Sequence, residues 1–381
     1  MSYIELTAPC IFGVESILKK EIIKLGYEIK KVDDGRVTFI ADELGVCRSN
    51  IWLRTAERVM INVGEFQATS FEELFEKTKD LPWERWIPED GKFWVKKASS
   101  IKSKLFSPSD IQSIIKKAIV ERLKNTYNVN WFKEDGDSYP LRVFIKKDKV
   151  SIGLDTSGEA LHKRGYRTYT SKAPISETLA AAIIQLTPWN KDRILVDPFC
   201  GSGTIPIEAS MYAMNMAPGL DREFTAETWK NIIPRKLWFN AVDEANDVID
   251  TTSKINIAGY DKDYKVLKLA RENAKNAGVD HLIHFQERDM RNISSPKKYG
   301  FIITNPPYGE RLEDKDSVIQ LYKDMKVAFN NLDDWSYFII TSFDDFERYF
   351  GKNADKKRKL YTGMMKANLY QYYGNKPPRK N

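Results

Sequence analysis

The chain of 381 residues is poor in cysteine and histidine, with three of each. Cys10, Cys47 and Cys200 form an odd and widely spaced set, which argues against a disulfide framework and favours a reducing compartment. His281 and His284 lie close together, but neither a cysteine nor a Glu-x-x-His pattern accompanies them. No metal site is therefore predicted.

Long apolar runs are also missing. No stretch approaches the roughly 20 apolar residues that a membrane-spanning helix needs, and the first residues lack the basic and apolar segments of a signal peptide. We therefore expect a soluble, cytoplasmic protein without a membrane partner. The charge excess is small, at +7 from 60 basic and 53 acidic residues, and it permits a polyanionic partner without requiring one.

The first half of the chain, residues 1 to about 165, alternates short strands and helices without a glycine-rich cofactor loop. Apolar residues at helical spacing predict a helix over 109–127, with Ser109 as its N-cap. Strands at 142–146 and 149–154 are predicted to form a hairpin around Lys147-Asp148. This pattern predicts an α+β module built of ferredoxin-like parts.

The second half alternates strand and helix more regularly, which predicts a mostly parallel sheet with helices on both faces. A helix over 263–277 is expected to end at Gly278. The last two strands have no helix between them, so an antiparallel hairpin should edge the sheet. The predicted strands are 193–197, 257–261, 282–289, 301–304, 335–342, 359–363 and 366–373.

A glycine-containing loop, Asp197-Pro-Phe-Cys-Gly-Ser-Gly-Thr204, follows the first of these strands and opens a helix. Gly201 and Gly203 permit a tight turn and let a ligand approach the backbone, with Cys200 beside them. The loop lacks the third glycine of a dinucleotide fingerprint and the Gly-Lys-Ser/Thr of a phosphate loop. By itself it fits a structural turn as well as a binding site.

Two acids that end the next strands favour a nucleoside cofactor. Asp261 can accept both hydroxyls of a ribose, and Asp289 can accept from an adenine amino group while Met290 packs on the ring. The alternative is that each acid only caps the helix that follows it.

The segment Asn305-Pro306-Pro307-Tyr308-Gly309 directly follows the apolar strand 301–304. Its prolines fix the backbone and lack N–H groups, so carbonyl oxygens and the Asn305 side chain can accept hydrogen bonds in a rigid loop. Two such acceptors suit the two hydrogens of an exocyclic amine on a nucleobase, and Tyr308 can stack on the base. These residues predict methyl transfer to such an amine, whereas a simple Pro-Pro turn is the alternative.

Further motifs resemble one family across nearly the whole chain. They are His162-Lys-Arg-Gly-Tyr-Arg167, Lys172-Ala-Pro-Ile-Ser-Glu-Thr-Leu-Ala-Ala181, Ala217-Pro-Gly-Leu220 and the continuation of the catalytic motif to Leu312. Together with the cofactor and amine motifs, they are similar to the bacterial guanine-N2 methyltransferases of 23S rRNA that carry a THUMP domain. Members of that family are often labelled N6-adenine-specific DNA methylases. Lys102 to Gln112 stands in the place of the THUMP signature.

The resemblance implies an α/β, class I Rossmann-like methyltransferase domain preceded by an α+β ferredoxin-like and THUMP module. It places the ferredoxin-like part at 1–55, the THUMP-like RNA-binding domain at 56–165 and the methyltransferase domain at 166–381. It implies S-adenosyl-L-methionine as cofactor. Asp197, Gly201 and Gly203 would line its methionine end, Asp261 its ribose and Asp289 its adenine, whereas Asn305, Pro306, Pro307 and Tyr308 would hold the target amine.

Basic residues gather between Lys92 and Lys124 and again at 162–167. On charge alone they fit a solvated surface, but the THUMP resemblance favours RNA, with large-subunit rRNA as the expected partner. The predicted RNA contacts are Lys102, Lys104, Lys163, Arg164 and Arg167.

Other functions stay open on the sequence. They are guanine-N2 methylation of tRNA, adenine-N6 methylation of nucleic acid, methylation of a protein amide and a non-catalytic role in RNA binding or ribosome assembly. The modified nucleotide and the oligomeric state are not predicted.

Overall fold

The computed structural model describes residues 3–167, 174–308, 315–362 and 365–378. Gly309 and parts of the motifs at 172–181 and 305–312 lie outside the described residues, as does the end of the strand expected at 359–363. The chain forms two compact units that do not follow chain order, so the domain boundaries expected at 55 and 165 stay predictions. Unit 1 comprises Met1–Pro9, Lys19–Leu161 and Glu223–Glu244, and unit 2 comprises Cys10–Leu18, His162–Arg222 and Ala245–Asn381.

Unit 1 contains a seven-stranded sheet, among the residues described, in the order β2-β3-β1-β4-β7-β6-β5. Its strands are β1 Ile4–Pro9, β2 Glu28–Asp33, β3 Arg36–Ala41, β4 Met60–Gln67, β5 Lys92–Ile101, β6 Ser138–Lys146 and β7 Lys149–Asp155. Its helical segments include α2 Glu43–Trp52, α3 Phe71–Lys79, η1 Trp83–Arg85, α4 Pro108–Tyr127 and η2 Thr225–Thr228.

Two predictions for unit 1 can be compared directly. Strands β6 and β7 pair antiparallel, and Lys147 and Asp148 both have a positive φ, as a two-residue hairpin turn requires. The predicted hairpin is confirmed. The predicted cap of α4 is wrong, because Ser107 caps the helix and Pro108 occupies its first turn, where a missing N–H costs nothing.

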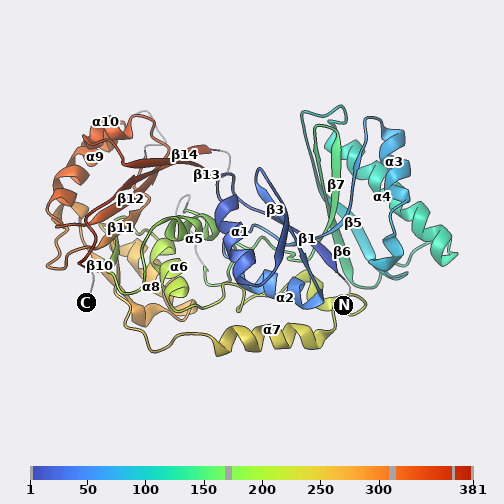
Figure 1. Ribbon diagram of the computed structural model, residues 1–381, viewed down its shortest axis with the longest axis horizontal. Coiled ribbons are helices and arrows are strands. Elements are labelled where there is room, and N and C mark those ends of the chain that lie inside the picture. The colour runs from blue at the N-terminus through green and yellow to red at the C-terminus, as the bar shows by residue number, and fades with distance from the viewer. Residues whose placement is uncertain (1–2, 168–173, 309–314, 363–364, 379–381) are drawn as a thin grey trace. The chain divides into compact units, whose positions relative to one another are not determined.

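Unit 2 contains the second seven-stranded sheet of the described chain, in the order β10-β9-β8-β11-β12-β14-β13 (Figure 1). The first five strands are parallel and β14 is antiparallel to both neighbours, so the expected hairpin edges the sheet. The strands are β8 Leu195–Asp197, β9 Ile257–Asp261, β10 Ile283–Glu287, β11 Phe301–Thr304, β12 Ser336–Thr341, β13 Lys356–Thr362 and β14 Met365–Tyr372.

Helices cover both faces of this sheet, with α5, α6 and α8 on one and α9 and α10 on the other (Figure 1). Because side chains alternate along a strand, Phe301 and Ile303 enter one buried cluster while Ile302 enters the other. The remaining helical segments are α1 Glu15–Lys24, α5 Glu177–Leu186, α6 Thr204–Ala213, α7 Arg235–Asp247, α8 Tyr264–Asn276, η3 Asp280–Leu282, η4 Met290–Asn292, α9 Lys315–Asn330 and α10 Phe346–Phe350.

The order of strands in unit 2 locates a binding site. Sequence-adjacent strands extend from β8 in one direction through β9 to β10, whereas β11 lies on its other side, so the strand order reverses between β8 and β11. Open α/β sheets bind ligands beyond the carboxyl ends of the strands at such a point. None of the helices within the described ranges is long and apolar enough to cross a bilayer.

Candidate active site

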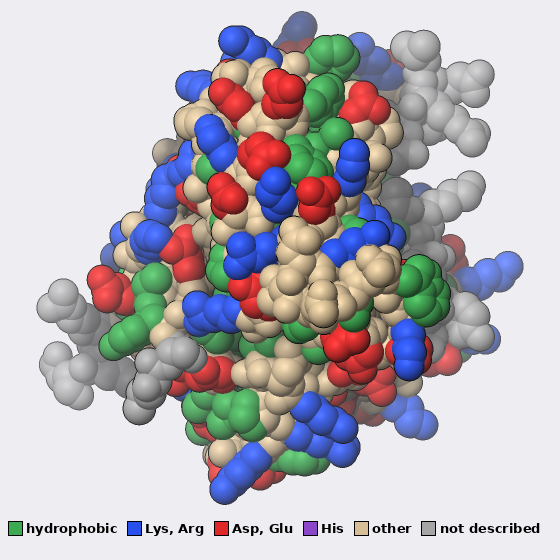
Figure 2. Space-filling model, turned by 90° about the vertical axis from the view of Figure 1, so that its right-hand side faces the viewer, with side chains coloured by type: hydrophobic (Ala, Val, Ile, Leu, Met, Phe, Trp, Pro, Cys, Tyr) green, Lys and Arg blue, Asp and Glu red, His purple; other side chains and the backbone are tan. Residues whose placement is uncertain are grey.

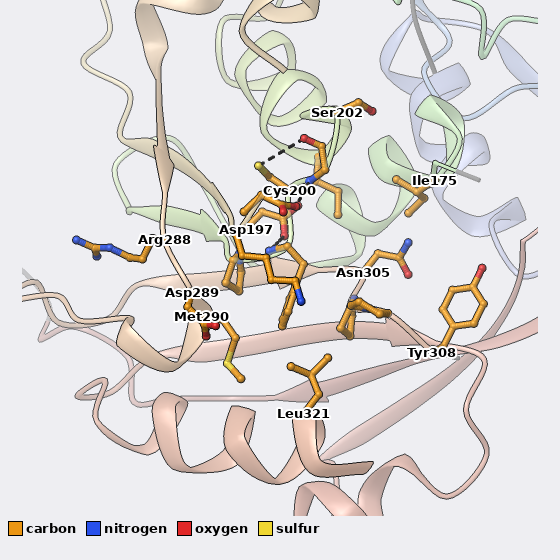
Figure 3. Close-up of a pocket in the computed structure, with 18 of the residues that line it drawn as sticks. Ile175, Asp197, Cys200, Ser202, Arg288, Asp289, Met290, Asn305, Tyr308 and Leu321 are labelled. Carbon is orange, nitrogen blue, oxygen red and sulfur yellow. Dashed lines mark hydrogen bonds between the residues drawn. The ribbon is translucent and has the colours of Figure 1, made fainter. Parts of the chain in front are cut away.

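A cavity of about 750 Å³ lies in unit 2 at the carboxyl ends of β8, β9 and β11 (Figure 3). Its volume is typical of sites for small molecules and cofactors. All of the predicted cofactor and catalytic residues line it except Gly203. These are Asp197, Cys200, Gly201, Asp261, Asp289, Met290, Asn305, Pro306, Pro307 and Tyr308.

The two glycines of the glycine loop, Gly201 and Gly203, have different roles that the sequence did not distinguish. Gly201 has a φ of 52° and an ideal Cβ there would meet nothing within 4 Å, so its backbone is open to a ligand. Gly203 has a φ of 85° and begins α6 as its N-cap. A Cβ on Gly203 would lie 3.2 Å from Ala270 and from Phe285. Gly203 therefore allows α6 to pack closely and does not itself line the cavity.

Asp197, the last residue of β8, is buried and accepts two hydrogen bonds. The Thr304 hydroxyl donates to it over 2.6 Å and the Phe199 N–H over 3.1 Å. Burial raises the pKa of Asp197 to about 7, although both hydrogen bonds act in the opposite direction. Sequence reasoning missed Thr304, whose only signal was a hydroxyl residue at the strand end before Asn305.

The carboxylate of Asp261 accepts a hydrogen bond from the glycine loop and does not cap the next helix. One carboxylate oxygen accepts from the Gly201 N–H at 3.1 Å and the other from the Asp263 N–H at 3.0 Å. Asp263, not Asp261, caps α8 through the Lys265 N–H. The capping alternative therefore fails for Asp261, and its carboxylate is oriented toward the loop that lines the cavity.

Asp289 does cap the short helix η4, accepting from the Arg291 N–H at 2.9 Å, and it forms an ion pair with the Arg291 side chain. It nevertheless lines the cavity together with the buried Met290. Figure 3 shows both residues on the opposite side of the pocket from Asn305 and Tyr308. An acceptor beside an apolar side chain suits the edge and face of an adenine ring.

The Asn305–Tyr308 loop directly follows β11 and is hydrogen-bonded to α9. Pro306 is buried, whereas Asn305 and Tyr308 are partly exposed to the cavity. The hydroxyl of Tyr322, a buried residue of α9, donates to the Pro307 carbonyl over 3.1 Å and lies 3.0 Å from the Thr341 hydroxyl. Tyr322 thereby fixes the loop to β12 and α9, a role that sequence reasoning did not assign.

The cavity is also lined by Ile175 and Thr204, neither of which was predicted. Arg167 holds them together, because one of its nitrogens donates to the Thr204 hydroxyl at 2.7 Å and to the Ile175 carbonyl at 3.3 Å. Its Nε lies 3.0 Å from the carboxylate of Glu177 at the start of α5. The RNA contact predicted for Arg167 is therefore revised to a positioning role inside the domain.

The structure also contradicts the RNA contact predicted for Arg164. Its guanidinium is buried against the buried carboxylate of Glu208 on α6, at 3.3 and 3.4 Å. The Tyr166 hydroxyl donates to the same carboxylate over 3.3 Å. Because a phosphate contact requires an accessible guanidinium, the RNA contact expected for Arg164 is wrong.

The predicted lysines stand on the surface. Lys102 and Lys104 are exposed in unit 1, and Lys163 is exposed in unit 2. The loop of the first two is held to the β6–β7 turn, because Asp148 accepts from the Lys104 N–H at 2.7 Å and donates its own N–H to Ser103 at 3.0 Å. The face drawn in Figure 2 shows basic and acidic side chains interspersed rather than a field of one sign.

The chemistry of the cavity fits a nucleoside bearing a cationic side chain. Two carboxylates, Asp197 and Asp261, flank an open glycine backbone, and Met290 provides an apolar surface at the far side. The five parallel strands with their antiparallel edge hairpin and this pocket define a Rossmann-like methyltransferase that uses S-adenosylmethionine.

Comparison with protein families identifies the chain further. Residues 164–371 match the RMKL-like methyltransferase domain, residues 5–60 the RlmL ferredoxin-like domain and residues 68–155 the THUMP domain. The chain belongs to the RMKL-like methyltransferase family.

Two relatives support this assignment. The chain is 46% identical over 376 residues to YpsC of Bacillus subtilis, which carries the name of an RNA methyltransferase, with 98% of the chain and 96% of YpsC aligned. It is 34% identical to the ribosomal RNA large subunit methyltransferase K/L of Shewanella pealeana, with 96% of the chain aligned. It spans about half of that relative, 53% of its length.

Solved structures give the same fold over the whole chain. A methylase structure from Clostridium difficile 630 is 56% identical, with both chains covered completely and a TM-score of 0.96. SMU.472, solved as a complex with SAH, is 41% identical with a TM-score of 0.93, over 99% of this chain and all of that one. A Listeria monocytogenes structure, named as a predicted N6-adenine-specific DNA methylase, is 46% identical with a TM-score of 0.93, over 98% and 97% of the two chains.

Proposed function

We propose that the protein transfers a methyl group to the exocyclic N2 amine of a guanine in 23S rRNA. The observation that carries the chemistry is the Asn305–Tyr308 loop, which lines one cavity with Asp197 and Asp261. Methyl transfer to RNA is supported by the THUMP match and by the names of YpsC and methyltransferase K/L. The guanine and its N2 atom rest on the family resemblance of the motifs.

Bound S-adenosylmethionine supplies an electrophilic methyl group on a sulfonium ion. The Asn305 side-chain oxygen and the Pro306 carbonyl accept hydrogen bonds from the two hydrogens of the target amine and favour its pyramidal, nucleophilic form. The nitrogen forms the new bond to the methyl carbon as the carbon–sulfur bond breaks, and the acidified amine then loses a proton to solvent. Positioning and fixed dipoles thus provide the catalysis without a strong base.

Asp197, Gly201, Asp261, Asp289 and Met290 hold the cofactor in this proposal. Asp197 and the Gly201 backbone face the cationic methionine end, and Asp261 accepts from the ribose hydroxyls. Asp289 accepts from the adenine amine, while Met290 packs on the ring. Cys200 forms part of the wall of the cavity. Burial raises the pKa of its thiol well above the ordinary value, so the thiol stays neutral.

Lys102, Lys104 and Lys163 are proposed as phosphate contacts that position the RNA. Each is exposed, and the first two stand on a loop whose backbone is hydrogen-bonded to the β6–β7 turn. Such contacts orient a nucleic acid without reading its sequence. Replacing both Lys102 and Lys104 with alanine should weaken binding across all RNA sequences and reduce its salt dependence.

The test is transfer of labelled methyl groups to separate pools of rRNA, tRNA and DNA, followed by analysis of the labelled nucleosides. The proposal expects N2-methylguanosine in rRNA. Label in tRNA guanine would instead favour tRNA as the substrate. Label only in DNA adenine, which is the activity in the name of the Listeria structure, would overturn the proposal.

Asn305→Ala should reduce the rate of transfer by about a hundredfold or more, as loss of a preorganised dipole does, while RNA binding is retained. Asn331→Ala, an exposed asparagine of the same unit just after α9, is the matched control and should leave the rate unchanged. A wild-type protein that binds RNA but neither binds S-adenosylmethionine in calorimetry nor transfers label would instead be a non-catalytic assembly factor.

A further inference from the structure

An aromatic and basic surface lies at the free edge of the methyltransferase sheet. Phe12 is 47% exposed and meets Tyr361 of β13 edge to face, with ring centroids 5.6 Å apart. The ammonium group of Lys359 lies 5.3 Å from the Tyr361 ring centroid. Lys366, which is opposite Tyr361 in the β13–β14 pairing, is exposed. These four residues, Phe12, Lys359, Tyr361 and Lys366, are called the edge surface below.

Phe12 is held at this edge although it comes from the start of the chain. Residues Cys10–Leu18 belong to unit 2, and Val14 and Ile17 enter the same buried cluster as Leu360 of β13. Gly13 has a φ of 92°, and a Cβ there would lie 2.8 Å from the Lys359 carbonyl oxygen. Only glycine allows the segment to pass this close to β13, so the position of Phe12 is fixed by the fold.

Strand pairing places Tyr361 of the edge surface at the same end of the sheet as the catalytic loop, namely the carboxyl end of the parallel strands. Thr304 pairs with Ile339, Ile339 with Tyr370, and Tyr370 with Lys357. Three steps of about 4.8 Å separate β11 from β13, or about 14 Å in all. Because β13 runs in the same direction as β11, Tyr361 lies beyond Lys357 toward the carboxyl edge, where Asn305 begins.

Lysines on an edge strand commonly prevent pairing with other chains. An exposed aromatic pair has the opposite effect, because apolar surface at an open edge promotes association. The combination of both is instead typical of proteins that bind single-stranded nucleic acid, in which aromatic rings stack on bases and cations contact phosphates. Lys356, Arg358 and Lys359 add positive charge to β13, whereas the neighbouring Lys357 forms an ion pair with Glu347.

We propose that the edge surface binds unpaired nucleotides that flank the methylated guanine in the RNA. Phe12 stacks on a base, and Lys359 and Lys366 contact phosphates. This inference rests on the proposed RNA substrate and adds to it a second contact that lies within the methyltransferase unit itself.

The experiment measures binding of a fluorescently labelled single-stranded oligouridylate to the full chain at several salt concentrations. Phe12→Ala should raise the Kd roughly tenfold, within the range for loss of one stacked base, and Phe12→Trp should keep it near the wild-type value. The double variant Lys359→Ala and Lys366→Ala should reduce the slope of log affinity against log salt by about 1.4, since each single-strand phosphate contact contributes about 0.7.

Tyr212→Ala is the matched control. Tyr212 is a 39% exposed aromatic near the end of α6, which runs from the cavity toward the opposite edge of the sheet, and its loss should leave RNA affinity unchanged. All variants should keep wild-type affinity for S-adenosylmethionine in calorimetry. If Phe12→Ala fails to fold, Phe12→Trp and the lysine pair still carry the test.

The outcomes separate the two proposals. A wild-type chain that binds no RNA overturns the proposed substrate itself. A wild-type chain that binds oligouridylate, with Phe12 and lysine variants that behave like Tyr212→Ala, overturns only the edge surface. Loss of a wild-type dimer in Phe12→Ala, with RNA affinity unchanged, would assign the surface to a second copy of the chain and also overturn the inference.

Discussion

The hydroxyl of Thr304, the last residue of β11, donates a hydrogen bond of 2.6 Å to the buried carboxylate of Asp197, the last residue of β8. The bond joins the strand that carries the catalytic loop to the strand that carries the glycine loop, where the strand order reverses. It also favours the ionised form of a carboxyl group whose burial raises its pKa to about 7.

Binding of S-adenosylmethionine should therefore depend on pH through Asp197. The cofactor is a cation, so its affinity should rise as the carboxyl group ionises between about pH 6 and 8. Asp197→Asn should weaken binding and flatten this dependence. Thr304→Val removes a bond that lowers the pKa, so the rise should move to higher pH. Calorimetric titration across this pH range is the measurement, and a wild-type affinity that does not change with pH would contradict the prediction.

The same carboxyl group should make the folded chain less stable as pH rises. In an unfolded chain an aspartate loses its proton near pH 4, whereas Asp197 keeps its proton up to about pH 7 in the fold. The folded state binds more protons between these values, so its free energy of unfolding falls from about pH 4 to pH 7. The melting temperature of the wild type relative to that of Asp197→Asn should therefore fall as pH rises over this range, and a constant difference would exclude the effect.

Tyr322→Phe should slow catalysis while sparing cofactor binding. The variant loses the hydrogen bond to Pro307 that fixes the catalytic loop, and small displacements of aligned groups are costly in rate. We expect kcat to fall about tenfold and the KM for S-adenosylmethionine to change less than about twofold. Tyr337→Phe is the control, because that buried hydroxyl donates to the Phe329 carbonyl at the end of α9 rather than to the catalytic loop. Equal losses in both variants would assign Tyr322 to general stability.

Arg164→Met should destabilise the chain by about 3–5 kcal/mol, because it leaves the buried Glu208 carboxylate without its cation. Adding Glu208→Leu should recover much of the loss, since an apolar pair can replace a buried ion pair. Urea unfolding measures both effects. If Arg164 instead contacted phosphate, Arg164→Met would weaken RNA binding at unchanged stability.

Gly203→Ala should cost more than Gly278→Ala. Both glycines have a positive φ, but a Cβ on Gly203 would lie 3.2 Å from Ala270 and Phe285, whereas one on Gly278 would meet nothing within 4 Å. The shared backbone term is about 1 kcal/mol, so the difference in melting temperature measures crowding alone. Equal losses would show that α6 moves to accommodate the methyl group.

Local chemistry made much of the site predictable. An apolar strand followed by Asn-Pro-Pro-Tyr, and acids at the ends of two further strands, predicted the residues that line the cavity, because parallel strands bring their carboxyl ends to one edge. The strands β9 and β11 match the predicted 257–261 and 301–304, and the edge hairpin also follows from strands that no helix connects.

Only the tertiary structure decided which charged residues turn inward. Lys163 and Arg164 are neighbours in the chain, yet Lys163 is exposed and Arg164 is buried, because Glu208 of α6 offers Arg164 a carboxylate 44 positions away. Likewise, no local pattern seats Phe12 against β13 or assigns Glu223–Glu244 to unit 1. Periodicity and turn chemistry extend over a few residues, whereas burial and ion pairing depend on groups that meet only after the chain has folded.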